Sequence, residues 1–182
     1  ELPVQSGNDA VLRRMARGYT ADHFRDLVAR IRAADAASAI NTDIIVGFPG
    51  ETADQFADTL QLVEEMRFDV VHIAAYSVRP GTPAANWPDD VPPEEKERRR
   101  VAIEELQTRI AGEINAAALG TTVEVLVDGR QRGRWRGRTR TNRLVFFADV
   151  GAWMGRLAQV RITWAGPWSL IGEVVGEGCP TF

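Results

Sequence analysis

The chain has 182 residues, which is enough for one large domain or two small ones. Hydrophobic residues make up 45% of it, so it can form a packed core and is not a globally disordered chain. Its single cysteine, Cys179, excludes an internal disulfide framework and any multi-cysteine metal or cluster site within one chain. There is no apolar run as long as a membrane span and no signal-peptide pattern, so we expect a cytoplasmic protein without membrane contact.

Charge is distributed unevenly along the chain. Residues 1–118 contain 13 Lys and Arg against 20 Asp and Glu, a net charge of -7. Residues 119–182 contain 9 Arg against 5 Asp and Glu, a net charge of +4. A basic module behind an acidic one suggests that the second module meets a polyanion, although two ordinary surfaces of different composition would give the same charges.

Strands and helices are predicted to alternate through the first part of the chain. In chain order they are a strand end at 2–4, a helix at 10–16, a helix capped by Thr20, a strand at 40–46, a helix at 52–66 and a strand at 70–76. A long, proline-rich loop at 77–93 follows, and its length favours a functional loop over a mere connector. A long helix then begins at Pro93 and is predicted to end at Gly120, with an apolar seam. The members of that seam are Ile103, Leu106, Ile110, Ile114 and Ala117.

The segment 42–52 is the most informative part of this module. Its apolar, β-branched run at 44–46 predicts a strand covered on both faces. Gly47 and Gly50 then indicate a sharp turn, and Thr52 with Gln55 forms a capping-box pattern that starts a helix. Such a strand-loop-helix unit places its loop at the carboxyl end of a parallel sheet, where α/β proteins bind their ligands.

Polar residues follow three consecutive predicted strands, which points to a shared site. They are Gln5 and Ser6 after the first strand, Glu51 after the second, and Tyr76, Ser77 and Arg79 after the third. Glu51 is able to accept hydrogen bonds from a ligand's hydroxyls or amine, or it is simply part of a structural turn. The arginine run 98–100 is predicted to lie on the solvated face of its helix.

From residue 121 the pattern changes to strict alternation. Val123, Val125 and Val127 alternate with polar residues, as do Val160, Ile162 and Trp164. About five half-buried antiparallel strands in roughly 60 residues predict a small closed barrel similar in size to an OB fold. The predicted fold class is therefore α/β followed by all-β.

One predicted strand of this module carries an arginine at every second position. Arg134, Arg136, Arg138 and Arg140 share a face in an extended strand, and Arg143 follows after a turn. Because this stripe contains no acidic residue, it favours nucleic acid over a solvated face. Trp135, between the first two arginines, either stacks on a base or packs inward.

Several segments resemble the radical S-adenosylmethionine (SAM) methylthiotransferases. They are 2–9 (LPVQSGND), 15–20 (MARGYT), 42–52 (TDIIVGFPGET) and 76–85 (YSVRPGTPAA). The second module resembles the TRAM domain of that family, a small RNA-binding β-barrel. Gly137-Arg138-Thr139, Asn142-Arg143 and Val145-Phe146 resemble the branch that acts on tRNA more than the branch that acts on a ribosomal protein.

The resemblance implies a reaction and its cofactors. The family adds a methylthio group to C2 of N6-isopentenyladenosine next to the tRNA anticodon, using SAM and two [4Fe-4S] clusters held by cysteines. This chain lacks those cysteines, so we expect it to be an inactive fragment of a longer enzyme, without bound clusters or SAM. The implied partner is the tRNA anticodon stem-loop.

The resemblance also assigns domains and site residues. Residues 1–118 would be the C-terminal half of the radical SAM barrel, 119–176 the TRAM barrel and 177–182 a tail. Residues near SAM would be Gln5, Ser6, Val46, Gly47, Phe48, Pro49, Gly50 and Glu51. Arg79 and Thr82 would face the substrate. RNA would meet Arg134, Trp135, Arg136, Arg138, Arg140 and Arg143.

Half of a parallel barrel has a physical problem, because its first and last strands have unpaired edges. We therefore expect self-association through those edges. Two other functions remain open at this point. One is a standalone RNA-binding protein whose α/β part is only a scaffold, and the other is the ribosomal-protein branch of the same family.

Overall fold

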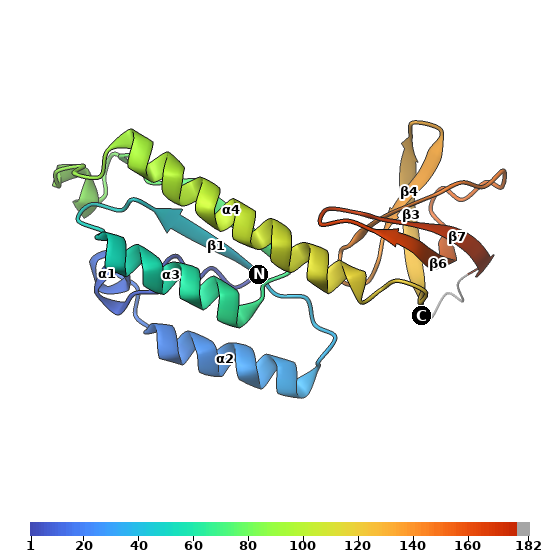
Figure 1. Ribbon diagram of the computed structural model, residues 1–182, viewed down its shortest axis with the longest axis horizontal. Coiled ribbons are helices and arrows are strands. Elements are labelled where there is room, and N and C mark those ends of the chain that lie inside the picture. Colours follow the sequence, from blue (N-terminus) through green and yellow to red (C-terminus); the bar gives the residue numbers. More distant parts are fainter. Residues whose placement is uncertain (178–182) are drawn as a thin grey trace. The chain divides into compact units, whose positions relative to one another are not determined.

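The computed structural model describes residues 1–177 (Figure 1). It contains two compact units, Glu1–Ile110 and Ala111–Phe182, and each is described here by itself. Cys179 and almost all of the expected tail at 177–182 lie outside the described residues.

The first unit is built around a short parallel sheet. Strand β1 (Asn41–Val46) pairs with β2 (Val70–Ala75) in parallel, with Asn41 opposite Val70. Residues 2–5 run along the other side of β1, where Gln5 forms an isolated parallel bridge to Ile44. The remaining elements are α1 (Asp9–Arg14), α2 (Ala21–Ala34), α3 (Ala53–Met66), a 3-10 helix (Pro83–Asn86) and α4 (Pro93–Ala116), whose last residues belong to the second unit. The predicted parallel βα arrangement is confirmed.

The helix starts follow the local sequence signals. Asn8 caps α1, and its side-chain oxygen accepts hydrogen bonds from the backbone of Ala10 and Val11. Thr20 caps α2 in the same manner. Thr52 and Gln55 form the predicted reciprocal capping box at the start of α3. These local contacts satisfy backbone donors that a helix start would otherwise leave unpaired.

Burial of β1 differs from the expectation. Ile44 and Val46 are fully buried, but Ile45 between them is only half-buried, so the strand is not covered equally on both faces. The reason is that Ile45 lines a cavity at the end of the sheet. In α4, Ile103 and Ile110 are buried as predicted, whereas Ala117 lies beyond the helix end and is exposed.

The second unit is a closed five-stranded barrel in the order β3-β4-β5-β7-β6. Its strands are β3 (Thr122–Gln131), β4 (Arg134–Arg138), β5 (Leu144–Phe147), β6 (Leu157–Ala165) and β7 (Leu170–Glu177). The predicted small barrel is confirmed, with one correction: β5 and β7 pair in parallel, so the sheet is mixed rather than all antiparallel. Its interior is filled by residues of several strands, including Val125 and Val127 of β3, Val145 and Phe147 of β5, and Val160 and Ile162 of β6.

Of two tryptophans in the barrel, Trp135 follows the alternation and Trp164 does not. Trp135 is only 9% exposed and packs in the core, with its indole N–H donating to the Asp149 carbonyl. Trp164 is 50% exposed, although it follows Val160 and Ile162 in the alternating pattern. A register shift between Ile162 and Trp164 breaks the alternation, because a bulge turns the next side chains of the strand to the other face.

Candidate active-site cavity and barrel surface

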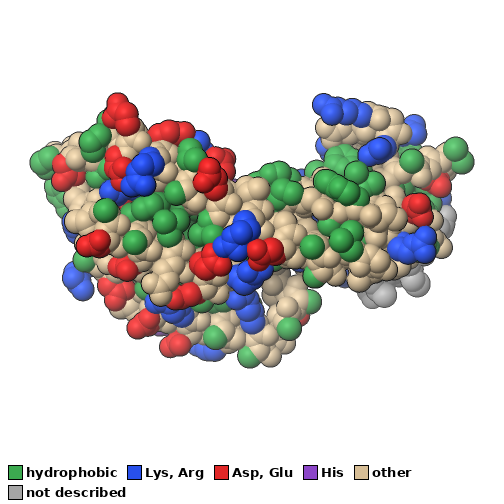
Figure 2. All heavy atoms as spheres, viewed as in Figure 1, with side chains coloured by type: hydrophobic (Ala, Val, Ile, Leu, Met, Phe, Trp, Pro, Cys, Tyr) green, Lys and Arg blue, Asp and Glu red, His purple; other side chains and the backbone are tan. Residues whose placement is uncertain are grey.

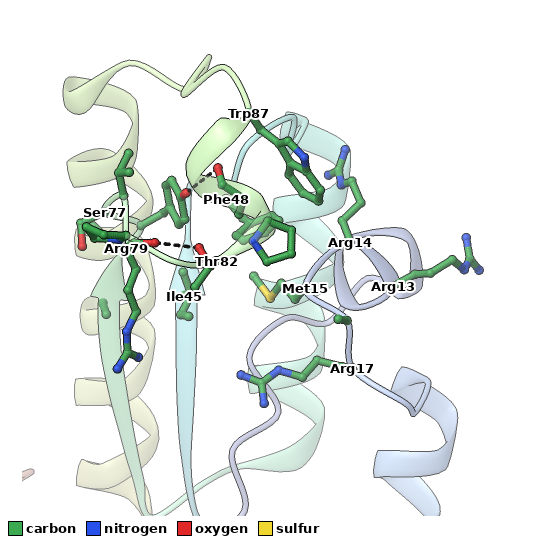
Figure 3. Close-up of a pocket in the computed structure, with 18 residues that line it drawn as sticks. Arg13, Arg14, Met15, Arg17, Ile45, Phe48, Ser77, Arg79, Thr82 and Trp87 are labelled. Atoms are coloured by element: carbon green, nitrogen blue, oxygen red, sulfur yellow. Dashed lines mark hydrogen bonds between the residues drawn. The ribbon is translucent and has the colours of Figure 1, made fainter.

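A cavity of about 760 Å³ lies at the carboxyl ends of β1 and β2 (Figure 3). Its floor is formed by Ile45, Ala74 and Ala75 from the two strands. The segment 76–80, the loop around Thr82 and the 3-10 helix form one wall, and α1 with the residues after it forms another. This is the edge of a parallel sheet where the sequence predicted a ligand site.

Three aromatic rings form the upper part of the cavity. Phe48 contacts Tyr76 edge-on, with ring centroids 5.2 Å apart, and contacts Trp87 at 5.9 Å. The Tyr76 hydroxyl donates to the Ala84 carbonyl at 3.2 Å, which holds the 3-10 helix against the strand end. A rigid aromatic wall of this kind provides a flat, apolar surface for a planar ligand group.

The same cavity is lined by four arginines and by no Asp or Glu among the residues that the structure describes. They are Arg13, Arg14, Arg17 and Arg79. In Figure 3, the Arg17 side chain extends toward the sheet, whereas Arg13 points away. Arg14 is held by a hydrogen bond to the Gln55 side chain at 3.2 Å. An acid-free cavity that combines arginines with aromatic rings favours a ligand with both a planar group and a negative charge.

Most of the predicted cofactor residues do not line this cavity. Phe48 does, and so do both predicted substrate-side residues, Arg79 and Thr82. The cofactor residues absent from its lining are Gln5, Ser6, Val46, Gly47, Pro49, Gly50 and Glu51. The arginines of 13–17 and Trp87 were missed, because they come from segments far from the strand ends in sequence. Two signals were available: Arg17 lies in the family-like segment 15–20, and Trp87 lies in the proline-rich loop 77–93.

Ser6 has a structural role rather than a ligand-facing one. It is fully buried, and its hydroxyl lies 3.3 Å from the Thr59 hydroxyl of α3. The next residue, Gly7, donates its backbone N–H to the same Thr59 oxygen at 2.9 Å. Gln5 is buried too, with a left-handed backbone (φ 71°). These contacts join the first segment to α3 instead of presenting polar groups to a ligand.

Glu51 is also committed to the protein itself. It is 4% exposed, and its Oε2 accepts hydrogen bonds from the Gly47 backbone at 2.6 Å and from Arg99 Nη1 at 2.9 Å. Of the two alternatives left open for Glu51, this arrangement corresponds to the structural turn. Burial raises the pKa of Glu51 above its ordinary value, while the bonds from Gly47 and Arg99 oppose that rise.

Arg99 corrects a second expectation. Instead of lying on a solvated helix face, it is 4% exposed and joins Glu51 to Glu95, at 2.9 and 2.7 Å. Arg99 also donates to the Glu51 backbone carbonyl at 3.0 Å. One guanidinium therefore fastens the loop after β1 to the first turns of α4.

Lys96 performs the equivalent task for the loop after β2. Its Nζ bonds both carboxylate oxygens of Asp89, at 2.6 and 2.7 Å, and the Tyr76 carbonyl at 3.3 Å. A side chain at Gly47 would have its Cβ 2.4 Å from Lys96 Cγ, so this approach requires glycine. Lys96 and Arg99 thus position both strand-end loops from one face of α4.

The ion pairs at the start of α4 predict acid sensitivity. Hydrogen bonds from Arg98 and Arg99 lower the pKa of Glu95 from 4.5 to about 2. A lowered folded-state pKa gives stability that is present above pH 4.5 and is lost as the pH falls toward 2. We expect Glu95→Gln to flatten the dependence of the urea midpoint on pH in this window. Parallel curves for the variant and the unaltered chain would contradict this.

The arginine stripe of the barrel is only partly as predicted. Arg134, Arg136 and Arg138 share the outward face of β4, but Arg140 lies in the turn beyond it. The stripe is not free of acidic neighbours, since Arg136 pairs with Asp128 at 2.9 Å across the sheet. Arg138 lies 4.0 Å from the same carboxylate, and Arg140 pairs with Glu124 at 2.9 Å. The acids come from β3, which the pattern of a single strand could not reveal.

Trp135 and Arg143 complete the predicted RNA-binding set. The inward alternative holds for Trp135: the Arg130 guanidinium covers its ring at 4.6 Å, and its burial leaves no face for a base. Arg143 is half-buried beside the Thr139 turn, where its backbone N–H donates to the Thr139 hydroxyl. Trp135 therefore packs in the barrel core and does not stack on a base.

The described residues offer neither a metal-ligand cluster nor a membrane-spanning helix. Among residues 1–177, no group of three or more His, Cys, Asp or Glu is placed to hold a metal ion. The chain's one cysteine cannot supply the three or four thiolates that an iron–sulfur cluster needs. Within the same residues, no helix combines the length and apolar character needed to cross a bilayer.

Comparisons with known proteins agree with the two units. A model of the Radical SAM superfamily matches residues 1–63, and a model of the TRAM domain matches residues 117–175. The tRNA-2-methylthio-N(6)-dimethylallyladenosine synthase of Roseiflexus sp. (strain RS-1) is 55% identical over 185 residues, covering 100% of this chain and 39% of the relative. The synthase of the same name from Chloroflexus aurantiacus is 54% identical over 175 residues, covering 94% and 38%.

The chain spans about two fifths of the length of the curated relatives it matches. Over that span the relatives cover both the α/β unit and the barrel. A radical SAM segment followed by a TRAM domain, with such relatives over nearly every residue, makes the chain similar to one part of the tRNA-2-methylthio-N(6)-dimethylallyladenosine synthases.

Proposed function

We propose that this chain is part of a tRNA methylthiotransferase, which adds a methylthio group to C2 of N6-isopentenyladenosine near the anticodon. The observation that carries the proposal is the 55% identity, over the whole chain, to a relative named for that class of product. The acid-free cavity at the strand ends adds physical support, because it offers aromatic and cationic groups at one place. In this proposal the chain works as part of a longer protein in the cytoplasm.

SAM fits the cavity in size and chemistry. A volume of about 760 Å³ lies within the range of small-molecule sites. Phe48, Tyr76 and Trp87 would pack against the adenine, and Arg17 or Arg79 would pair with the carboxylate. In this family the bound cofactor supplies the radical. The residues of this chain would bind and orient the cofactor and exclude water from it.

Iron–sulfur clusters do not fit the residues of this chain. With one cysteine in 182 residues, the ligands of the two proposed [4Fe-4S] clusters must come from other parts of a longer protein. The chain alone should therefore bind no iron or sulfide and form no methylthiolated product. Detection of either in the purified chain would contradict this expectation.

A hybrid enzyme tests the proposed activity directly. The matching two fifths of the Roseiflexus relative would be replaced by this chain, and tRNA from a host without the modification would be examined by mass spectrometry. We expect methylthiolated isopentenyladenosine with the hybrid. A hybrid that folds but leaves the tRNA unmodified, beside an active parent, would contradict the proposal. Methylthiolation of a ribosomal protein instead would favour the other branch of the family.

Two arginines of the cavity distinguish the enzyme from the scaffold alternative. If the α/β unit is only a scaffold for an RNA-binding barrel, Arg17→Ala in the hybrid should not affect the product. If the cavity holds SAM, the same change should lower activity by at least ten-fold, while Arg13→Ala, whose side chain points away, should have little effect.

We also propose that the open edge of the sheet mediates self-association. Among the described residues, β2 has a strand partner only on its β1 side. An exposed parallel edge is a template for a further strand. Light scattering of the purified chain should report a dimer or larger species, and a strictly monomeric chain would contradict the idea.

A further inference from the structure

The outer surface of the barrel carries a second hollow, whose lining does not include the acid-paired arginines Arg136, Arg138 and Arg140. It is a groove of about 590 Å³ lined by Arg132 and Arg134 at the β3–β4 hairpin, Phe146 on β5, Ile171 on β7 and Trp164 on β6. Figure 2 shows basic side chains gathered at the tip of the second unit. No Asp or Glu lines this groove within the part of the chain that the structure describes.

The strand register places the apolar members of the groove in one row. Trp164 is the cross-strand partner of Ile171, Ile171 is the partner of Phe146, and Phe146 is the partner of Arg136. Adjacent strands are about 4.8 Å apart, so the Trp164 and Phe146 positions, separated by β7, lie about 10 Å from each other. The row therefore forms a continuous apolar platform with an aromatic residue at two of its positions.

The Trp164 side chain has a fixed position on this platform. Its ring lies against Gly166, where an added Cβ would be 2.3 Å from the indole Cη2. The turn that contains Gly166 is stabilised by the Asn115 side chain, which donates to the carbonyls of Gly166 and Pro167 at 2.8 and 3.1 Å. The bulge before Trp164 turns the ring outward, which is a known use of bulges next to binding sites.

The charges beside the platform are available to a ligand. Arg132 and Arg134 have no carboxylate partner among residues 1–177, unlike Arg136, Arg138 and Arg140, which meet acids of β3. Their fields are therefore not cancelled by neighbouring protein charges. Unpaired arginines next to exposed aromatic rings are the combination by which proteins hold single-stranded nucleic acid, with phosphates on the cations and bases on the rings.

We infer that this groove, rather than the acid-paired arginines Arg136, Arg138 and Arg140, is the main RNA contact of the barrel, with a base stacked on Trp164 and backbone phosphates on Arg132 and Arg134. The inference rests on the proposed tRNA-related function and specifies where the barrel meets RNA. The occupant is a single-stranded RNA segment. A double helix would not present an unstacked base to Trp164.

Fluorescence anisotropy with a short, labelled, single-stranded oligoadenylate and with unmodified tRNA tests this inference on the whole 182-residue chain. Trp164→Ala should weaken binding by ten-fold or more. The matched control is Trp168→Ala, since Trp168 is 56% exposed in the next turn but does not line the groove. That control should change the affinity by less than two-fold. Quenching of tryptophan fluorescence by RNA should disappear only in the Trp164 variant.

The arginines are tested by salt dependence. In an Arg132→Ala/Arg134→Ala double variant, the slope of log affinity against log salt should fall by about 1.4, because each lost phosphate contact removes about 0.7 for a single strand. The control is Arg140→Ala/Arg161→Ala, which removes two arginines that already have carboxylate partners. That variant should retain nearly the original slope.

The outcomes separate the groove from the proposed function. Equal affinities for the Trp164 and Trp168 variants, with RNA binding otherwise intact, would overturn the groove and leave the RNA-related function standing. A larger fall in the salt slope in the Arg140/Arg161 variant than in the Arg132/Arg134 variant would also overturn the groove and leave the RNA-related function standing. If the unsubstituted chain binds neither probe, both the groove and the RNA-binding part of the proposed function are wrong.

Discussion

Arg99→Met should lower the free energy of unfolding of the first unit by about 3–5 kcal/mol, the range measured when one member of a buried ion pair is removed. The change leaves the Glu51 carboxylate buried, with the Gly47 N–H as its remaining hydrogen-bond donor. Glu51 Oε1 already lacks a hydrogen-bond partner, and Arg14 would be the remaining nearby cation that favours the ionised carboxylate. The loop after β1 should loosen as a consequence.

Hydrogen exchange followed by mass spectrometry is the suitable measurement, because it resolves peptides of one unit while the other remains folded. Peptides covering β1, α3 and the first turns of α4 should exchange faster in the variant. The matched control is Arg100→Met at the next position, where Arg100 pairs with Glu97 and Glu104 on the helix surface. An exposed pair of this kind contributes about 1 kcal/mol or less.

A double variant separates charge burial from lost packing. Arg99→Met combined with Glu51→Gln leaves no buried charge, and the glutamine oxygen still accepts the Gly47 N–H. We expect the double variant to recover part of the stability that Arg99→Met loses. If the double variant is less stable than Arg99→Met alone, the penalty does not come from the uncompensated Glu51 charge.

Phe147→Ala should destabilise the barrel by about 3–5 kcal/mol, the usual cost of removing a buried phenylalanine side chain. Phe147 is 1% exposed and packs edge-on against Trp153, with ring centroids 6.0 Å apart. Its loss opens a cavity among core residues of several strands, which the closed sheet cannot collapse to fill. The measurement is urea unfolding followed by near-ultraviolet circular dichroism.

The neighbouring Phe146 provides the control and links the fold to the proposed RNA groove. It lies on the opposite face of β5, half-buried in the groove. Phe146→Ala should cost clearly less stability than Phe147→Ala but should weaken RNA binding several-fold, because it removes part of the platform. Equal destabilisation by the two changes would mean that the barrel core does not depend on the inward face of β5.

Several features of this protein follow from local sequence. The caps at Thr20 and Thr52 form as predicted, and Asn8 caps α1 in the same way, because each side chain bonds backbone groups only two or three residues away. The parallel βα unit and the small barrel could likewise be predicted from apolar periodicity. Part of the cavity could be predicted as well: Arg79 follows the end of a predicted strand, and the family resemblance assigned Phe48 and Thr82. In all these cases the deciding interactions are close in the chain.

The remaining features were decided by contacts between distant segments. Arg99 and Arg100 look alike in sequence, yet only Arg99 meets Glu51, 48 residues away, and becomes buried. Arg13, Arg14 and Arg17 reach the cavity because α1 packs beside the strand ends, which no helix pattern reveals. The alternation on β6 placed Trp164 inside, but a bulge against β7 turned it outward. Periodicity shows which residues share a face of one element, whereas partner charges and bulges depend on the neighbouring elements, and these are determined only when the chain folds.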